Sequence, residues 1–415
     1  MSVIAVRAMG VGKSCLLIAL MLAVIVTGQS PDISNLDLTE KITPLGIAPS
    51  PQDGYGSGPN QLAQPDDVEF LADGSLLVSD VNNDRIQLFS PSGKFVSSIT
   101  ADDLGLSGEI APTGIAKDGG GYIYVTLEEK GTIVRLNPDL TVDQFIGKPC
   151  DISEEDYYRS EYEDCLLKPQ GLIVSPAGDV FVVDMAKKIF RKGKVYNFGF
   201  RKFRREGSSF RYDTEFAASQ EVTQVMRKSE GMFIDDARRW LFIAEEKPLK
   251  NQFGNSAKYR YVALFDLDTG KFLERLLGVT MQNGSIVSGL IDDSVEGVRL
   301  FGNYLFAVDE KGGRVYVVQI QTGKLAGFFG KNAFYYCDDH SDCVIDGINY
   351  NEQNIIVGGA FPHLKNSWRK NELASPDGVA AVQLEDGSRR LAVVDQWNSR
   401  IVIYDLDQIL ALLTD

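Results

Sequence analysis

Acidic residues recur in this sequence at two fixed places around short apolar runs, and they are its strongest candidates for chemistry. Four of them precede a glycine or a second acid where an apolar run begins: Asp66, Glu230, Glu296 and Asp377. Others close an apolar run: Asp80, Asp184, Glu245, Glu246, Asp309 and Asp395. Converging carboxylates need a counter-charge, and hard oxygen ligands favour Ca²⁺, with Mg²⁺ second. A second interpretation stays open, because an acid that ends a strand also caps a turn by accepting backbone N–H groups.

The composition excludes several classes of function. The 415 residues include two histidines, His340 and His363, so a site built on several imidazoles is excluded. The net charge of −15 makes nucleic acid and anionic lipid unfavourable partners. His340 lies between Cys337 and Cys343, but this spacing is not that of a Cys/His zinc module.

A strip of basic residues interrupts the acidic chain between positions 187 and 211. Guanidinium groups pair bidentately with phosphate. We therefore interpret six of these cations as contacts for an anionic small-molecule substrate: Lys187, Lys188, Arg201, Lys202, Arg204 and Arg205. Two alternatives remain. A nucleic acid or acidic glycan would fit the same local charge, or the strip neutralises the acidic segment 151–164 of the same chain.

The carboxylates belong to a sequence repeat that predicts how they are positioned. A small tripeptide, a β-branched strand and an alternating strand recur six times in this order, and the tripeptides begin at Pro65, Pro112, Pro169, Ser229, Val295 and Pro376. The alternating strand of the third copy is assigned to Lys188–Tyr196. Six such copies predict an all-β, six-bladed β-propeller over residues 62–412. The innermost strand of a blade begins on the face where the second strand ends, so both sets of acids are expected on one rim of the channel.

Several segments resemble two known families. The runs Asp80–Ile86 and Asp395–Ile401 look like NHL repeats, which build six-bladed propellers. The run Glu230–Asp236, followed by Ile243–Glu246, is similar to the central motif of the β-propeller phytases, and Asp66-Asp67 resembles their early double aspartate. The sequence departs from the phytase pattern at Val68 and Ser294, where that family has a proline and an acid.

The phytase resemblance implies a calcium-dependent phosphoric ester hydrolase, in which Glu230, Glu296 and Asp377 would be catalytic. The calcium ions would be held by Asp66, Asp80, Glu230, Glu245, Glu246, Glu296, Asp309, Asp377 and Asp395. Two other functions remain open. One is a non-enzymatic NHL-type propeller that binds a protein or glycan, and the other is a lactonase-like hydrolase with a single calcium ion.

The N-terminus and the cysteines indicate export. Residues 1–28 combine Arg7 and Lys13 with an apolar run and a small-residue exit, which predicts a signal peptide and a secreted or periplasmic protein without a transmembrane span after cleavage. Residues 29–61 are interpreted as a leader that contributes one strand to close the ring. Four cysteines remain after cleavage, and short loops favour the disulfides Cys150–Cys165 and Cys337–Cys343.

Overall fold

The structure is a computed structural model, and it describes most of the chain from Ile33 to Leu413. The described residues are 33–49, 55–149, 165–184, 189–191, 194–196, 200–217, 229–245, 260–277, 280–282, 285–288, 291, 294–332, 344–345, 348–349 and 371–413. Among the residues so described, no helix is both long and apolar enough to cross a membrane.

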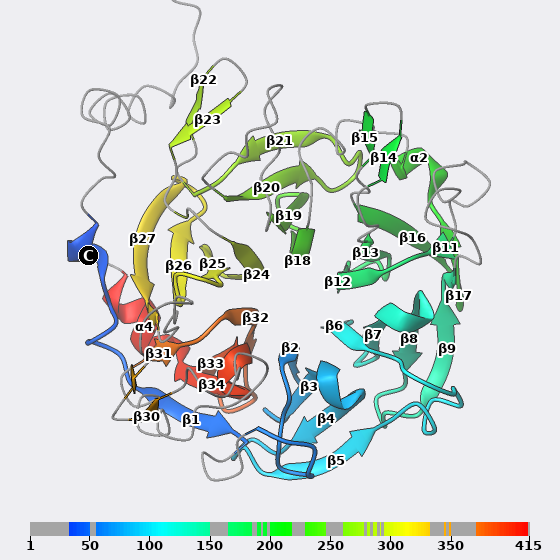
Figure 1. Cartoon of the computed structure of the whole chain (residues 1–415). Coiled ribbons are helices and arrows are strands. Elements are labelled where there is room, and N and C mark those ends of the chain that lie inside the picture. The colour runs from blue at the N-terminus through cyan, green and yellow to red at the C-terminus, as the bar shows by residue number, and fades with distance from the viewer. Residues whose placement is uncertain are drawn as a thin grey trace, which may run out of the picture.

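Six four-stranded antiparallel sheets surround a central channel, which confirms the predicted six-bladed β-propeller (Figure 1). Blades one to three run outward from the channel as β2 (Pro65–Phe70), β3 (Leu76–Asp80), β4 (Arg85–Phe89), β5 (Phe95–Ile99); β6 (Pro112–Lys117), β7 (Ile123–Leu127), β8 (Thr132–Leu136), β9 (Val142–Ile146); and β12 (Pro169–Val174), β13 (Val180–Asp184), β16 (Phe200–Glu206), β17 (Ser209–Tyr212).

Blades four to six follow the same plan. They consist of β18 (Ser229–Asp235), β19 (Trp240–Glu245), β20 (Tyr261–Asp266), β21 (Phe272–Arg275); β24 (Val295–Phe301), β25 (Tyr304–Asp309), β26 (Arg314–Gln319), β27 (Lys324–Phe329); and β32 (Pro376–Gln383), β33 (Arg389–Asp395), β34 (Arg400–Asp405), β1 (Pro44–Ala48). The outermost strand of blade six is thus the N-terminal β1, which pairs with β34. A strand from the leader closes the ring as expected, and the propeller includes residues before position 62.

Short elements lie between and beside the blades. Five two-stranded sheets pair β10 (Lys148–Pro149) with β11 (Cys165–Leu166), β14 (Ile189–Arg191) with β15 (Lys194–Tyr196), β22 (Thr280–Gln282) with β23 (Ser285–Ser288), β28 (Lys331–Asn332) with β31 (Glu372–Leu373), and β29 (Val344–Ile345) with β30 (Ile348–Asn349). The described helices are the 3-10 turns η1 (Ser34–Leu36), η2 (Val81–Asn83), η3 (Glu128–Lys130) and η6 (Gln396–Asn398), and the α-helices α2 (Thr214–Ala217) and α4 (Leu406–Leu412).

The third strand of blade three was assigned wrongly from the sequence. The segment Lys188–Tyr196 contains the separate hairpin β14–β15, and β16 is the strand that pairs with β13. The basic composition of β16 hides its strand character. Phe200 and Phe203 are buried in it, and so is the side chain of Arg201.

The hydrophobic core lies between neighbouring blades rather than within any one of them. One cluster joins Leu77 and Ile86 of blade one to Ile115, Val125 and Val134 of blade two, and equivalent clusters fill the other junctions. Burying each such side chain contributes about 1.5–3 kcal/mol. Because each blade buries its faces only against its neighbours, closure of the ring is a condition for the stability of every blade.

Candidate functional site

Each innermost strand starts with a β-bulge, and these bulges position the side chains of the site. In all six blades the register against the second strand shifts after the first residue of the tripeptide, for example between Val295 and Val298. The bulge turns one side chain of blades one, four, five and six toward the channel: Asp66, Glu230, Glu296 and Asp377. The equivalent residues of blades two and three bond elsewhere. Thr113 pairs with Thr126, and Gln170 donates to Glu128.

Glycines at the next position bring the inner strands into near contact. A Cβ on Gly231 would lie 2.6 Å from the carbonyl oxygen of Glu296 and 2.9 Å from the Cα of Gly297. Gly114, Gly171, Gly297 and Gly378 face their neighbouring blades in the same way. The glycines that follow Glu230, Glu296 and Asp377 therefore narrow the ring, and this draws the acids of successive blades together.

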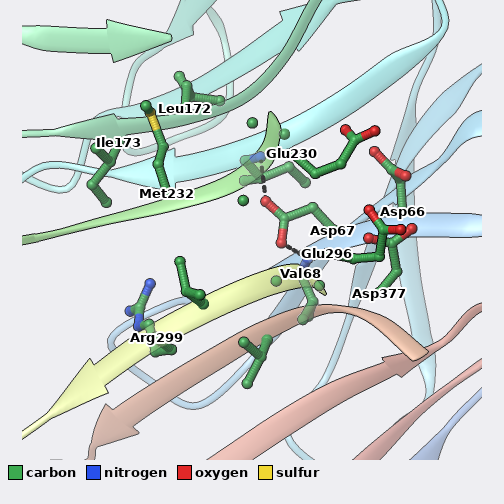
Figure 2. Close-up of a pocket in the computed structure, with 18 residues that line it drawn as sticks. Asp66, Asp67, Val68, Leu172, Ile173, Glu230, Met232, Glu296, Arg299 and Asp377 are labelled. Atoms are coloured by element: carbon green, nitrogen blue, oxygen red, sulfur yellow. Dashed lines mark hydrogen bonds between the residues drawn. The ribbon is translucent and has the colours of Figure 1, made fainter. Parts of the chain in front are cut away.

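The four acids form one cluster, which we call the acidic mouth: Asp66, Glu230, Glu296 and Asp377. All four line a single pocket at the channel, and their carboxylates point toward one another (Figure 2). Burial raises the pKa of Asp377 well above its ordinary value, and the charges of Asp66, Glu296 and Glu230 raise it further. A hydrogen bond with Asp66 acts in the same direction.

Two neutral donors hold carboxylates of the acidic mouth. The Gln396 amide Nε2 donates to Asp377 Oδ2 at 2.7 Å, and the Ser294 hydroxyl donates to Glu296 Oε1 at 2.5 Å. Ser294 is one of the two positions at which the sequence departs from the phytase pattern, and its hydroxyl lies beside Glu296.

Asp67 is a pocket residue that the sequence interpretation did not select. It stands where the other five blades have glycine, and its side chain lines the channel (Figure 2). Its Oδ1 accepts from the backbone N–H of Val68 at 2.8 Å and its Oδ2 accepts from that of Ile115 at 2.9 Å. Burial raises the pKa of Asp67 to about 7, although these two backbone hydrogen bonds lower it. The break in the glycine pattern is the signal that could have identified it.

An apolar layer and then an ion pair follow the acidic mouth along the inner strands. One apolar side chain comes from each blade at the level after the glycines: Val68, Ile115, Leu172, Met232, Val298 and Val379. One residue further along, Arg299 of blade five donates to both oxygens of Glu69 in blade one, at 3.0 and 3.3 Å. Glu69 is buried. The pocket therefore extends from the acidic mouth, past the apolar layer, to Arg299, whose charge Glu69 neutralises.

The acids that end the second strands lie behind the rim and cap turns. Asp80 accepts from the backbone N–H of Ala63 at 2.7 Å and from the guanidinium of Arg85 at 2.8 Å. Asp395 does the same with Ala374 at 2.6 Å and Arg400 at 2.6 Å. Asp184 follows this pattern with Lys168 and Arg201. The turn-capping interpretation describes the contacts of these three residues, and none of them lines the pocket.

The remaining strand-end acids are also engaged away from the pocket. Asp309 accepts the backbone N–H of Gly312 at 2.9 Å, and Glu245 accepts the hydroxyl of Ser229 at 3.1 Å. Glu246 lies outside the described residues. Neither Asp309 nor Glu245 lines the channel pocket that the strand-start acids line.

The described basic residues pair with acids of their own blade. Arg201 contacts Asp184 at 3.2 Å, Lys202 contacts Asp179 at 3.0 Å, and Arg204 contacts Asp213 at 2.8 Å. Arg205 donates to the carbonyl oxygen of Gly207. These four cations lie on β16, the third strand outward from the channel, and none lines the pocket. Charge neutralisation inside the molecule therefore accounts for three of them, although with acids other than those of segment 151–164.

Several predicted residues lie outside the described part of the chain: Lys187, Lys188, Cys150, Cys337 and Cys343. Cys165 is disulfide-bonded, and its pairing with Cys150 stays a prediction. In the described part of the chain, no set of three or more His, Cys, Asp or Glu side chains is already arranged to hold a metal ion.

Comparisons with known proteins identify no family. No protein-family model matches the chain, and no curated protein matches it. Similar solved structures include a gluconolactonase of Xanthomonas campestris, with 12% identity over 83% of this chain and 87% of that chain and a TM-score of 0.47. A putative gluconolactonase (9% identity, 89% and 95% covered, TM-score 0.49) and a streptogramin B lyase (10%, 85% and 98%, 0.43) are others. Identities and scores this low carry no information about activity.

Proposed function

We propose that this protein is a calcium-dependent hydrolase whose active site is the acidic mouth. The observation that carries the proposal is the convergence of Asp66, Glu230, Glu296 and Asp377 from four successive blades on one pocket. The pKa of Asp377 is raised by its burial and further by the charges of Asp66, Glu296 and Glu230. A divalent cation would offset this repulsion, and four hard oxygen donors without imidazole favour calcium.

The donor chemistry of the mouth fits the cation, although its side chains are not arranged around one in the described part of the chain. Asp377 and Asp66 are joined by a hydrogen bond, which requires one proton between the two carboxyl groups. Release of this proton and small side-chain rotations would free oxygens of the four acids for a single ion. A bound divalent cation acts as a Lewis acid toward a carbonyl oxygen. Glu230, Glu296 and Asp377 would hold it and orient the substrate at the pocket entrance.

The bond that is cleaved is proposed to be a carboxylic ester or lactone rather than a phosphoric ester. Arg299 is the cation among the described residues that line the pocket, and Glu69 already neutralises it. A polyphosphorylated substrate needs several cations around it, whereas the described cations of β16 pair within their own blade. A neutral ester fits an acidic entrance above an apolar layer. The disulfide-bonded Cys165 supports an exported location for this activity.

Metal content and a substrate panel test the proposal together. The purified protein is dialysed against calcium, its bound metal is measured by mass spectrometry, and hydrolysis of aryl esters, lactones and a phosphorylated inositol is compared. One calcium ion per chain and chelator-sensitive ester or lactone cleavage support the proposal. Several ions with phosphate release would favour the phosphoric ester hydrolase. No bound ion and no hydrolysis would leave a binding protein.

A further inference from the structure

The channel pocket has an apolar part that takes no part in the bond cleavage itself. It consists of six buried side chains, one from each blade, which we call the apolar layer: Val68, Ile115, Leu172, Met232, Val298 and Val379. Figure 2 shows Leu172 and Met232 apart from the cluster of carboxylates, on the same side as Ile173. The pocket thus has a polar end and an apolar end, and a molecule that fills it needs the same two ends.

The polar side chains beyond the acidic mouth already have hydrogen-bonding partners. Asp67 Oδ1 and Oδ2 each accept a backbone N–H group. Arg299 donates to both oxygens of Glu69 and to the carbonyl oxygen of Ala381. Burying a hydroxyl group without a partner is unfavourable. Among the described residues, this part of the pocket therefore favours a hydrocarbon chain over a hydroxylated one.

The size of the pocket limits the length of such a chain. A volume of about 40 Å³ is open to the centres of water-sized molecules, and one water molecule needs about 10–15 Å³ of this kind of space. The pocket therefore has room for about three water molecules. Because a methylene group is similar in size to a water molecule, a chain of about three or four carbons fills the pocket.

We infer that the apolar layer binds a short aliphatic chain of the substrate while the acidic mouth acts on its carbonyl end. The inference rests on the proposed function for the identity of the cleaved bond. It narrows the substrate to esters or lactones with a chain of about three or four carbons. An aryl group is too large for this space, so in an aryl ester the acyl chain is the part that enters. Each methylene group buried against the layer should strengthen binding about fourfold.

Binding is tested first without cleavage, in the absence and in the presence of calcium. Straight-chain methyl ketones have the carbonyl group and the chain of such an ester but no bond that can be hydrolysed. Ligand-observed NMR titration should show an affinity that rises about fourfold for each added methylene group and falls once the chain exceeds about four carbons. A ketone with a hydroxyl group at the end of its chain should bind about tenfold more weakly than its counterpart of the same length.

A matched pair of variants locates the bound chain. Leu172→Ala enlarges the apolar layer, and Leu241→Ala makes the same change in the same core cluster at a residue that does not line the pocket. We expect Leu172→Ala to shift the best-bound ketone to a longer chain, and Leu241→Ala to keep the parent optimum. If either variant unfolds, Ile115→Val and its control Ile123→Val, which share another core cluster, repeat the comparison with a smaller change.

Hydrolysis of aryl esters with acyl chains from acetyl to octanoyl completes the test. The value of kcat/KM should peak at the chain length that gives the highest ketone affinity, and Leu172→Ala should shift both. Affinity that does not depend on chain length, or equal profiles for Leu172→Ala and Leu241→Ala, overturns the inference, and ester cleavage would then leave the proposed function standing. Chain-dependent ketone binding without any hydrolysis supports the apolar layer as a binding site and overturns the proposed function.

Discussion

Arg299 and Glu69 form an ion pair across the channel, between blade five and blade one. The guanidinium also donates to the carbonyl oxygen of Ala381 in blade six, at 3.2 Å, and lies 4.9 Å from the ring centre of Phe233 in blade four. This side chain of blade five thus contacts the other three blades that carry the acidic mouth. The Arg299–Glu69 pair lies further along the channel than the acidic mouth. It joins blades five and one, which stand on either side of blade six, where β1 closes the ring.

Replacing Arg299 by leucine should destabilise the protein by about 3–5 kcal/mol, because it leaves the buried Glu69 carboxylate without its partner. The additional change Glu69→Leu should restore most of that loss. Urea denaturation of the two single variants and the double variant measures the coupling between the residues. Additive effects in the double variant would contradict an ion pair of this strength.

Replacing Asp377 by asparagine should stabilise the metal-free protein and weaken calcium binding. The change removes a buried carboxyl that is repelled by Asp66, Glu296 and Glu230, while the amide oxygen still accepts the bond from Gln396. Each unit of pKa elevation relieved is worth about 1.4 kcal/mol. Thermal unfolding with and without calcium checks both effects. The exposed Asp386→Asn is the control, and equal calcium-induced stabilisation in parent and variant would remove Asp377 from the site.

Replacing Asp395 by asparagine should have the opposite pattern. Asp395 is fully buried and neutralises Arg400, so its loss is expected to cost about 3–5 kcal/mol. The amount of calcium bound per folded chain should not change, because the carboxylate caps a turn behind the rim. Calcium content measured under conditions where the variant remains folded decides between the roles. A lower content would return Asp395 to the list of ligands.

Asp67 should make the metal-free protein less stable as the pH rises from about 4 to about 7. Burial raises the pKa of Asp67 from 3.8 to about 7, so the folded protein binds this proton more tightly than the unfolded chain does. The stabilisation is complete below about pH 4 and is lost as the pH passes the folded value, at no more than about 1.4 kcal/mol per pH unit.

Urea denaturation across this pH range should give a slope that Asp67→Asn removes. The Asp386→Asn variant should retain the slope, because the bond from the Ser388 hydroxyl lowers the pKa of Asp386 below this range. Parallel pH curves for the parent and Asp67→Asn would contradict the raised pKa.

The repeat predicted the fold and the mouth because both follow from local features. A tripeptide such as Pro376-Asp377-Gly378 encodes a bulge, an acid that points toward the channel, and a glycine. Because the glycine has no side chain, the next blade can pack closely against it. Asp67 was not selected because two consecutive acids look like one motif. Its position becomes informative only when the blades are compared, since the other five blades have glycine there. The pair Arg299–Glu69 could not be predicted, because no local pattern links residues in blades five and one.

The strand-end acids show a second limit of what the sequence can predict. Asp80 and Asp395 are carboxylates at strand ends, and the sequence left two roles open for them. Arginines five residues later, Arg85 and Arg400, decided the outcome by pairing with them inside the blade. The partners of the basic strip were hard to foresee for a related reason, because Asp179 and Asp213, which pair with Lys202 and Arg204, come from other segments of the same blade.

The pairing of β1 with β34 has a consequence for synthesis. Ile47 lies opposite Val402, so β1, the first of the described strands in chain order, has no partner until β34, the last of them, has been synthesised. Until β34 has been synthesised, β1 cannot complete blade six. Blades one and five then have no blade between them to cover the sides that face each other. A nascent chain of five blades is therefore an open arc with two unsatisfied ends, and truncation at either terminus should expose the same seam.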